Sequence, residues 1–279
     1  MEEITSRKNE KVKFLADLGD DAKLRTETGL CVAHGTKLCV EAARFGCGIE
    51  QLWVTKRFLD ANEKDIGPLV SKAKMIFFMS EEVCEKISPL RTPQGVVAAV
   101  KYSINQKEQQ YISHNRIAAL CAVQDPANVG AVIRVAAGLG YETVIMDGQC
   151  ADPFSPKALR ASMGAAFAID IVRRENLADE IDLLKKAGHK TIAAALVRDA
   201  INISDIDTCD KLTIVFGNEG KGLPSGIISS CHCAAVIPIS DKVESLNIAT
   251  AAAIAMWELR ICRPSLDTSS IYRQGQDND

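Results

Sequence analysis

Short apolar runs alternate with amphipathic stretches along most of the chain, and this alternation predicts strands and helices in turn. Near the N-terminus, Val12, Leu15 and Leu18 recur at helical spacing, so residues 8–18 are expected to form a helix. Short apolar runs bounded by polar residues are typical of buried strands. The first third of the chain contains such runs at residues 30–33, 51–55, 75–79 and 96–100. Strands that alternate with helices indicate an α/β domain.

A polar stretch at residues 103–115 lacks apolar periodicity and is typical of a linker. Beyond it the alternation resumes. The expected strands are 117–123, 143–146, 190–196, 212–216 and 235–239, and the expected helices are 129–139, 156–167, 176–187, 224–230 and 245–260. This order indicates a second α/β domain with a parallel sheet. The predicted organisation is an N-terminal domain, a linker and a C-terminal domain, over residues 1–105, 106–115 and 116–279.

Composition and charge exclude several classes of protein. Of the 279 residues, 47% are hydrophobic and 25% are charged, which is close to the globular average and unlike a disordered or fibrous chain. No apolar run approaches the roughly 20 residues that cross a membrane, and the first residues do not resemble a secretory signal. We expect a cytoplasmic protein, or an organellar one if a transit peptide has been removed. The net charge of −3 leaves a nucleic-acid partner open, because local patches bind phosphate.

Ten cysteines are many for this length, but their pattern does not indicate a metal site. Most of them lie singly in apolar stretches and none forms a CxxC pair, so we expect reduced, mostly buried thiols. The Cys231-His232-Cys233 triplet has no further ligand at a suitable spacing, and neighbouring residues of a strand point to opposite faces. We therefore expect no bound metal.

Three segments of the C-terminal domain are not readily explained as scaffold, and they are residues 124–134, 214–224 and 237–251. Each leaves a predicted strand, and open α/β sheets bind ligands at the carboxyl ends of their strands. In the first, Arg134 lies in an otherwise apolar helix, where a charge should be paired or should meet a ligand. In the second, Glu219 lies in a glycine-rich turn that matches neither the Walker A nor the dinucleotide-binding pattern. In the third, Asn247 begins a small-residue helix that is apolar nearly all round and is therefore expected to be buried.

Each segment also has a plainer interpretation as a capped turn. Asp125 or Asn128 could cap the helix of the first segment, and Ser245 could cap the helix of the third. The glycine-rich segment could be a tight turn with exposed charges. Taken singly, the segments leave both interpretations open.

Together the three segments resemble the signature motifs of the SpoU/TrmH family of RNA ribose 2′-O-methyltransferases, within the SPOUT superfamily. In chain order the matching residues are Asn128-x-Gly130-x-x-x-Arg134, Phe216-Gly217-Asn218-Glu219-Gly220-x-Gly222-Leu223 and Ile237-Pro238-x-x-x-x-Val243-Glu244-Ser245-Leu246-Asn247. The segment Arg160-Ala161-Ser162-Met163-Gly164-Ala165 fits the stretch between the first two motifs. The resemblance covers residues 117–260.

The N-terminal third resembles, more weakly, the small substrate-binding domain that many members of this family carry. The matching residues are Ser6-Arg7-Lys8-Asn9, Lys23-x-Arg25, Gly35, and Pro89 through Gln94-Gly95. His34 departs from the pattern, since relatives commonly place an acid before the glycine. A histidine beside a buried strand is more often structural than functional.

The resemblance implies a fold, a reaction and a set of partners. The fold is a small α/β RNA-binding domain followed by an α/β SPOUT domain with a trefoil knot. The reaction is methyl transfer from S-adenosylmethionine to a ribose 2′-hydroxyl of RNA. The two-domain layout favours rRNA, and tRNA stays open. The resemblance also implies a homodimer with the active site across its interface, to which the apolar helix 245–260 could contribute.

The resemblance also implies the site residues. Cofactor contacts fall at Leu196, Gly217, Ile237 and Leu246, and the catalytic residues are Arg134, Asn128, Glu219, Ser245 and Asn247. The resemblance gives Arg134 the role of the base. An arginine is normally protonated, so gripping the target phosphate and polarising the hydroxyl is physically the less costly role, and the protonation state of Arg134 in catalysis stays open. Asn128 would hold Arg134 or the backbone turn, and Glu219 would orient Arg134 or the ribose. Ser245 and Asn247 would complete the hydrogen-bond shell of the hydroxyl. Phosphate contacts are expected from Arg7, Lys8, Lys11, Lys23 and Arg25, although each of them singly is more simply explained as solvated helix surface.

Three other functions are compatible with parts of this pattern. A related enzyme could modify a base, although the first and third motifs together favour ribose. A non-catalytic RNA-binding protein could use the same scaffold, but it would be expected to lack Arg134, Glu219 or Asn247, and all three are present. A plain nucleotide-binding protein is disfavoured because the chain has no phosphate loop.

Overall fold

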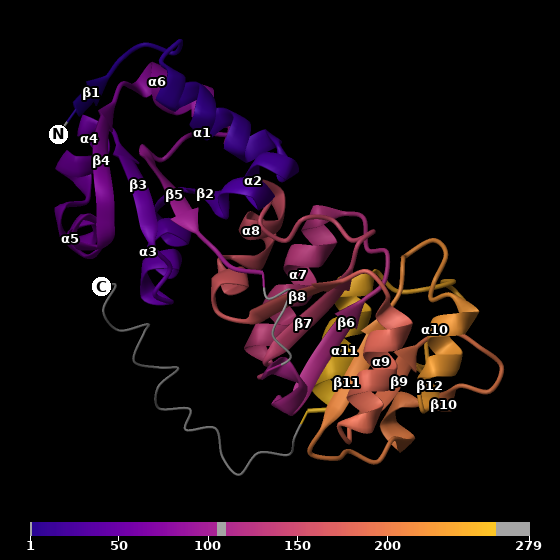
Figure 1. The fold of residues 1–279 in the computed structure, drawn as a ribbon. Coiled ribbons are helices and arrows are strands. Elements are labelled where there is room, and N and C mark those ends of the chain that lie inside the picture. The colour runs from indigo at the N-terminus through magenta and orange to yellow at the C-terminus, as the bar shows by residue number, and fades with distance from the viewer. Residues whose placement is uncertain (1, 105–109, 261–279) are drawn as a thin grey trace.

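Each part of the chain forms its own sheet with helices on both faces, as the alternation of strands and helices predicts (Figure 1). The computed structural model describes residues 2–104 and 110–260. In the N-terminal domain five strands lie in the order β1-β4-β3-β5-β2, and only the pairs made by β5 are antiparallel. These strands are β1 (Glu2–Ile4), β2 (Leu30–His34), β3 (Ile49–Val54), β4 (Ala73–Met79) and β5 (Val96–Lys101).

Helices cover both faces of this first sheet. They are α1 (Glu10–Asp20), α2 (Ala22–Thr28), α3 (Thr36–Arg44), α4 (Lys56–Ala61), α5 (Glu63–Lys72) and α6 (Glu81–Ile87). The predicted helical stripe of Val12, Leu15 and Leu18 is fully buried on α1, which packs beside α6 on one face. Helices α3 and α5 pack together on the other face, in a core that continues into the C-terminal domain.

The C-terminal domain contains seven parallel strands, which confirms the predicted parallel sheet. Their order is β10-β12-β9-β11-β6-β7-β8. The strands are β6 (Arg116–Leu120), β7 (Thr143–Asp147), β8 (Asp170–Arg174), β9 (Lys190–Ala194), β10 (Ile201–Asn202), β11 (Leu212–Phe216) and β12 (Cys233–Val236). Strands β6, β7 and β11 are buried along their whole length, because helices cover both faces of the sheet.

Helices α7, α8 and α11 pack on one face of this sheet, and α9 and α10 pack on the other. Their bounds are α7 (Pro126–Gly138), α8 (Pro156–Ser162), α9 (Leu177–Lys186), α10 (Ser225–Ser230) and α11 (Ile248–Glu258), and short 3-10 turns lie at η1 (Gln110–Ser113), η2 (Ala165–Phe167) and η3 (Ile203–Asp205). No helix in the described part of the chain is long and apolar enough to cross a membrane.

Helix α11 differs from its prediction in two ways. Asn247 caps it, since its side-chain oxygen accepts a hydrogen bond from the Ala249 N–H at 2.9 Å, and Ser245 lies outside the helix. The helix is also not buried all round. Ile254 and Trp257 are 40% and 55% exposed, so one apolar stripe of α11 faces away from the core. The composition of a helix does not show which of its sides the fold covers.

The end of the predicted linker packs against the C-terminal domain. Tyr111, in η1, is fully buried, and its hydroxyl donates a hydrogen bond to Glu180. Arg174 donates to the same carboxylate and to the Tyr111 oxygen, at 3.0 Å each. Residues 110–113 are therefore held by the C-terminal domain, while residues 105–109 lie outside the described part of the chain.

A buried ion pair joins the two domains. The Arg25 guanidinium, on α2, donates to Asp152 at 2.6 Å and to the Leu18 and Gly19 carbonyl oxygens at 2.8 Å each. Arg25 is only 3% exposed. The prediction that Arg25 contacts RNA phosphate is therefore wrong, because the side chain is enclosed between the domains. Beside the ion pair, the Tyr102 ring stacks on the Phe154 ring with centroids 4.0 Å apart.

The cysteines of the described chain are free thiols, as the sequence predicts, and most of them are buried. Burial raises the pKa of Cys39 to about 12, so this thiol stays protonated. Cys262 lies outside the described residues. In the Cys231-His232-Cys233 triplet, the His232 ring is 2.9 Å from the Thr191 hydroxyl.

His34 ends strand β2 and is buried, in agreement with a structural role. Neither ring nitrogen has a hydrogen-bond partner among the described residues. Burial first, and then the nearby charge of Arg160, lower the pKa of His34 to about 4. The ring is therefore neutral in the folded protein near neutral pH.

This lowered pKa predicts a pH-dependent stability. An unfolded histidine has a pKa of about 6.5, so the unfolded chain takes up a proton first as the pH falls. We expect His34 to reduce the free energy of unfolding by about 2 kcal/mol between pH 7 and pH 5. Urea unfolding gives the free energy of unfolding of the wild type and of His34→Gln at both pH values. The contribution of His34 is the difference between the two proteins in the change from pH 7 to pH 5. Equal pH dependence in the two proteins would contradict it.

Candidate active site

The three segments singled out in the sequence lie together at the carboxyl ends of the parallel strands. Asn128, Glu219 and Asn247 come from different segments, and their side chains form one cluster. The Asn128 amide donates to Glu219 Oε1, and the Asn247 amide donates to the same oxygen at 3.1 Å and to Asn128 Oδ1 at 3.2 Å. The sheet register explains this meeting, because β11 pairs directly with β6.

The helix caps beside this cluster do not use the amide nitrogens of Asn128 and Asn247, so both nitrogens can donate to Glu219. Asp125 caps α7 by accepting a hydrogen bond from the Ala127 N–H at 3.0 Å, so Asn128 is not needed as the cap. Asn247 caps α11 with its oxygen and uses its amide nitrogen for the cluster. Hydrogen bonds to an ionised acceptor are stronger than neutral ones. The carboxylate of Glu219 therefore joins the starts of two helices.

The glycine-rich turn after β11 is folded back on itself by Asn218. Its side-chain oxygen accepts hydrogen bonds from the Gly220 and Lys221 N–H groups, at 2.9 and 3.1 Å, and its amide donates to the Ala122 carbonyl oxygen at 2.9 Å. A Cβ on Gly217 would collide with the backbone of Gly222, which explains the glycine there. We did not predict Asn218 as a site residue, although asparagine is a common turn residue, because its side chain can bind the backbone two residues on.

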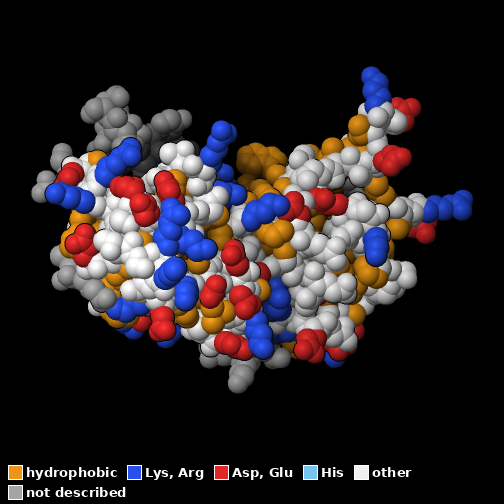
Figure 2. All heavy atoms as spheres, turned by 90° about the horizontal axis from the view of Figure 1, so that it is seen from above, with side chains coloured by type: hydrophobic (Ala, Val, Ile, Leu, Met, Phe, Trp, Pro, Cys, Tyr) orange, Lys and Arg blue, Asp and Glu red, His pale blue; other side chains and the backbone are white. Residues whose placement is uncertain are grey.

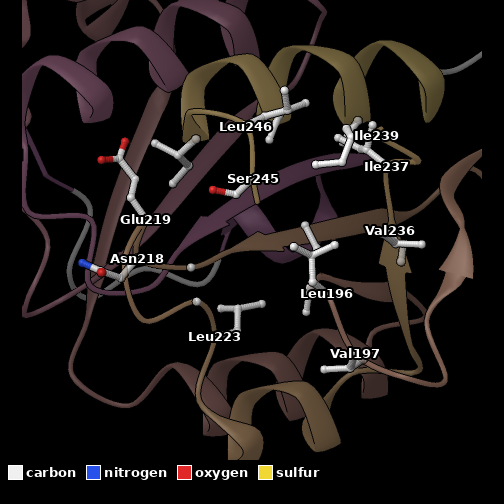
Figure 3. A pocket seen from close by; sticks show the side chains of 18 of the residues that line it. Leu196, Val197, Asn218, Glu219, Leu223, Val236, Ile237, Ile239, Ser245 and Leu246 are labelled. Atoms are coloured by element: carbon white, nitrogen blue, oxygen red, sulfur yellow. The ribbon is translucent and has the colours of Figure 1, made fainter. Parts of the chain in front are cut away.

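A pocket of about 470 Å³ lies between this turn, the end of β9 and the loop that leads into α11 (Figure 3). All four predicted cofactor contacts line it, namely Leu196, Gly217, Ile237 and Leu246. Glu219 and Ser245, two of the predicted catalytic residues, line it as well. Leu196 is 64% exposed at its wall, so the pocket presents apolar surface that no other part of the described chain covers. Ile239 and Val236 also line it and were not predicted.

Arg134, a predicted catalytic residue, does not contact the cluster of Asn128, Glu219 and Asn247. It is exposed on α7 and makes no hydrogen bond or ion pair with the described residues. The expected contacts from Asn128 or Glu219 to Arg134 are therefore not present. Gly130, in the same motif, has a packing role, because a Cβ there would collide with the Ala158 carbonyl oxygen of α8.

The remaining predicted phosphate contacts lie on the surface of the N-terminal domain. Most of them already have partners. Arg7 pairs with Glu85 at 3.2 Å, Lys23 lies 3.7 Å from Glu27, and the Lys11 ammonium lies 4.9 Å from the centre of the Phe77 ring. Lys8 is exposed. On the side of the molecule drawn in Figure 2, basic side chains lie among acidic ones.

The N-terminal domain also has a hollow of about 880 Å³ at the end of its sheet, away from the linker. Gly95, with a φ of 82°, lines it, and Gly35, with a φ of 87°, directly precedes the lining residues Thr36 and Lys37. Between them the Gln94 side chain accepts a hydrogen bond from the Thr36 N–H at 2.9 Å. Lys37 and Arg57 line this hollow and are exposed, and Lys37 pairs with Glu41 at 2.8 Å. Both glycines are among the residues by which the N-terminal third resembles the substrate-binding domain of the family.

The chain matches the SpoU rRNA Methylase family over residues 115–257 and the MRM3-like substrate binding domain over residues 9–98. It belongs to the SpoU rRNA methylase family. The predictions of family and of a two-domain α/β fold are thereby confirmed. The two matched ranges agree with the two sheets of the structure.

Relatives in this family share most of the chain. A Bacillus subtilis protein named 23S rRNA (guanosine(2553)-2′-O)-methyltransferase RlmP is 31% identical over 260 residues, which cover 93% of this chain and all of that protein. The 23S rRNA (guanosine-2′-O-)-methyltransferase RlmB of Acinetobacter baylyi is 32% identical, with 67% of this chain and 77% of that protein covered. A crystal structure of an AdoMet-bound rRNA methyltransferase from Sinorhizobium meliloti is similar with a TM-score of 0.83 and 30% identity, covering 92% of this chain and 97% of that one.

Proposed function

We propose that this member of the SpoU family transfers the methyl group of S-adenosylmethionine to a ribose 2′-hydroxyl of rRNA. The observation that carries the proposal is the cluster of Glu219, Asn128 and Asn247 at the edge of the 470 Å³ pocket. The names of the two relatives, both rRNA 2′-O-methyltransferases, support the reaction and the substrate class. The AdoMet-bound structure supports the cofactor.

The pocket has the chemistry that this cofactor requires. Its walls are apolar side chains such as Leu196, Ile237 and Leu246, and the backbone of the turn at Gly217 supplies polar groups. Ligand pockets typically combine an apolar lining with a few polar groups that fix orientation. S-adenosylmethionine, when bound, supplies an electrophilic methyl group on a sulfonium. The residues of the chain then have to place a hydroxyl in line with it.

Glu219 is suited to orient that hydroxyl. Both amide donors of the cluster bind Oε1, and no described residue donates to Oε2. Oε2 is therefore available to accept a hydrogen bond from the ribose 2′-OH, in a position that the two asparagines fix. Holding the reacting groups in line supplies several kcal/mol of the barrier reduction. Ser245, on the pocket wall beside Glu219, completes the polar edge (Figure 3).

Cofactor binding is the first test of this function. Isothermal titration calorimetry with S-adenosylmethionine should give one site per chain. Leu246→Arg should weaken binding at least about tenfold, since it places a charge on an apolar wall. The control is Val243→Arg, because Val243 lies in the same loop, is exposed and does not line the pocket. Folded wild-type protein that is free of ligand and does not bind the cofactor would contradict the proposed reaction.

Methyl transfer to isolated rRNA and tRNA, with mapping of the modified nucleotide, then identifies the substrate. Ribose methylation of rRNA is the expected result. Methylation of tRNA alone would correct the substrate class. Binding of RNA with neither cofactor binding nor methyl transfer would favour the non-catalytic alternative. The cytoplasmic or organellar location stays a prediction from the sequence, and the trefoil knot stays a prediction of the family resemblance.

We also propose that the protein acts as a homodimer through α7 and α11. These helices pack together on one face of the sheet, and α11 exposes the apolar side chains Ile254 and Trp257. Exposed Arg134 lies on α7, apart from the cluster of its own chain. In a dimer that pairs these helices, Arg134 of one chain would reach the active site of the other and grip the target phosphate.

The dimer proposal predicts a specific effect of charge on α11. Trp257→Glu should shift sedimentation velocity from a dimer to a monomer and should abolish methyl transfer, because a carboxylate would be buried in an apolar interface. Met75→Glu is the control, since Met75 is a comparably exposed apolar residue of the N-terminal domain. A wild-type protein that is monomeric at the concentrations where it is active would disprove the shared site.

For RNA affinity we propose the hollow of the N-terminal domain, with Lys37 and Arg57 as phosphate contacts. Lys37→Ala with Arg57→Ala should weaken binding of an rRNA fragment and lower its salt dependence by about 0.7 per lost contact in log–log slope. Lys8→Ala with Lys23→Ala is the matched control and tests two of the contacts predicted from the sequence. Fluorescence anisotropy across a salt series measures both effects. A larger loss in the control pair would reassign the RNA surface to the turn before α1 and to α2.

A further inference from the structure

One loop, residues 147–155 between β7 and α8, contacts both the turn that begins the active site and the N-terminal domain. Its first residue, Asp147, ends strand β7 and is buried. One carboxylate oxygen accepts a hydrogen bond from the Ala122 N–H at 2.9 Å. The other accepts from the Gln149 and Cys150 N–H groups of the loop itself, at 3.0 Å each. Asp147 therefore ties the turn after β6 to the start of this loop.

Ala122, the residue held by Asp147, has a left-handed backbone conformation with φ of 54°. This conformation costs an L-residue other than glycine free energy, and it persists where the surroundings hold it. Both polar groups of Ala122 are held, since its carbonyl oxygen accepts the amide of Asn218 at 2.9 Å. The left-handed turn is thus clamped from two neighbouring strand-end loops.

The clamped turn directs the chain into the active site. Three residues beyond Ala122, Asp125 caps α7, whose first turn carries Asn128. The turn and the loop are joined further by the Ala151 N–H, which donates to the Val123 carbonyl oxygen at 2.9 Å. A shift of the loop therefore moves the start of α7 and with it the Asn128 amide that binds Glu219.

The far end of the same loop holds the N-terminal domain. Asp152 accepts hydrogen bonds from the Arg25 guanidinium at 2.6 Å and, with its other oxygen, from the Phe154 N–H at 2.8 Å. Phe154 in turn stacks on Tyr102, where the chain leaves β5. The Asp152 carboxylate lies at the domain junction and pairs with a guanidinium that is almost fully buried.

We propose that this loop is a positioning element that presents RNA held by the N-terminal domain to the Glu219 cluster in a fixed geometry. Asp147 is the positioning residue for the catalytic turn, and Asp152 is the positioning residue for the N-terminal domain. The inference rests on the proposed function. No residue of the loop lines the 470 Å³ pocket. The loop reaches the pocket-lining residue Asn218 only indirectly, through Ala122, so we expect it to act mainly on the RNA side of the reaction.

Steady-state kinetics with an rRNA substrate separate the two roles. Asp147→Asn places an amide against backbone N–H groups, and we expect kcat to fall about tenfold or more, since small misplacements of reacting groups are costly. Its KM for RNA and its Kd for S-adenosylmethionine should stay within about twofold of wild type. Asp152→Asn weakens the link to Arg25, and we expect KM for RNA to rise with kcat at saturating RNA retained. Asp182→Asn, a substitution of an exposed carboxylate on α9, is the control.

A second variant shows whether the effect of Asp147 runs through the clamped turn. Glycine adopts positive φ without a steric cost, so Ala122→Gly combined with Asp147→Asn should recover part of the lost kcat. If Asp147→Asn alone does not fold, the kcat of the double variant still tests whether Asp147 acts through the turn at Ala122. Kinetics of Asp147→Asn and Asp152→Asn equal to wild type would overturn the proposal, and so would a parallel loss of cofactor affinity. A wild type that neither binds the cofactor nor methylates RNA would instead overturn the proposed function.

Discussion

The carboxylate of Glu219 accepts hydrogen bonds from two amides that belong to different strand-end loops, and the geometry of the candidate site depends on this shared acceptor. A hydrogen bond to a charged group contributes about 1.5–3 kcal/mol when it is shielded and less when water competes. Asn247 is exposed, so these bonds alone cannot hold the loops in place. The loops have to be ordered beforehand, and Asn218 and Asp147 do this from positions behind the cluster.

The parallel sheet makes such an arrangement possible. Strands β6 and β11 are adjacent and buried on both faces, so their carboxyl ends are fixed by packing rather than by the loops. Each loop starts from a rigid position and needs only a few hydrogen bonds to acquire one conformation. The same sheet keeps α7 and α11 side by side, because both pack on its one face. The asparagines at their amino ends therefore meet at Glu219.

Features that depend on residues close together in the sequence could be predicted from it. The spacing of apolar residues predicted the inner strands of both sheets and β2, but it missed β1, β8 and β10, which lie at the edges of the sheets. The three motifs predicted which strand ends carry the site. The sequence did not allow prediction of contacts between distant segments. Arg25 and Asp152 are 127 residues apart, and nothing near Arg25 in the sequence shows that a buried carboxylate from the other domain lies against it. The separation of Arg134 from Glu219 is of the same kind, because it depends on which face of α7 the fold leaves exposed.

The polar residues of these loops also show why a scaffold role and a site role could not be told apart from the sequence. Backbone N–H groups at strand ends and helix starts have no partner in the ladder, and side-chain oxygens have to accept their hydrogen bonds. Asp147 and Asp152 do this for loop residues, and Asn247 does it for α11. Each of the three side chains also has a second polar atom. That atom contacts Ala122 in the case of Asp147, Arg25 in the case of Asp152 and Glu219 in the case of Asn247. Capping and function are therefore not alternatives at Asn247: the cap orients the amide that binds Glu219.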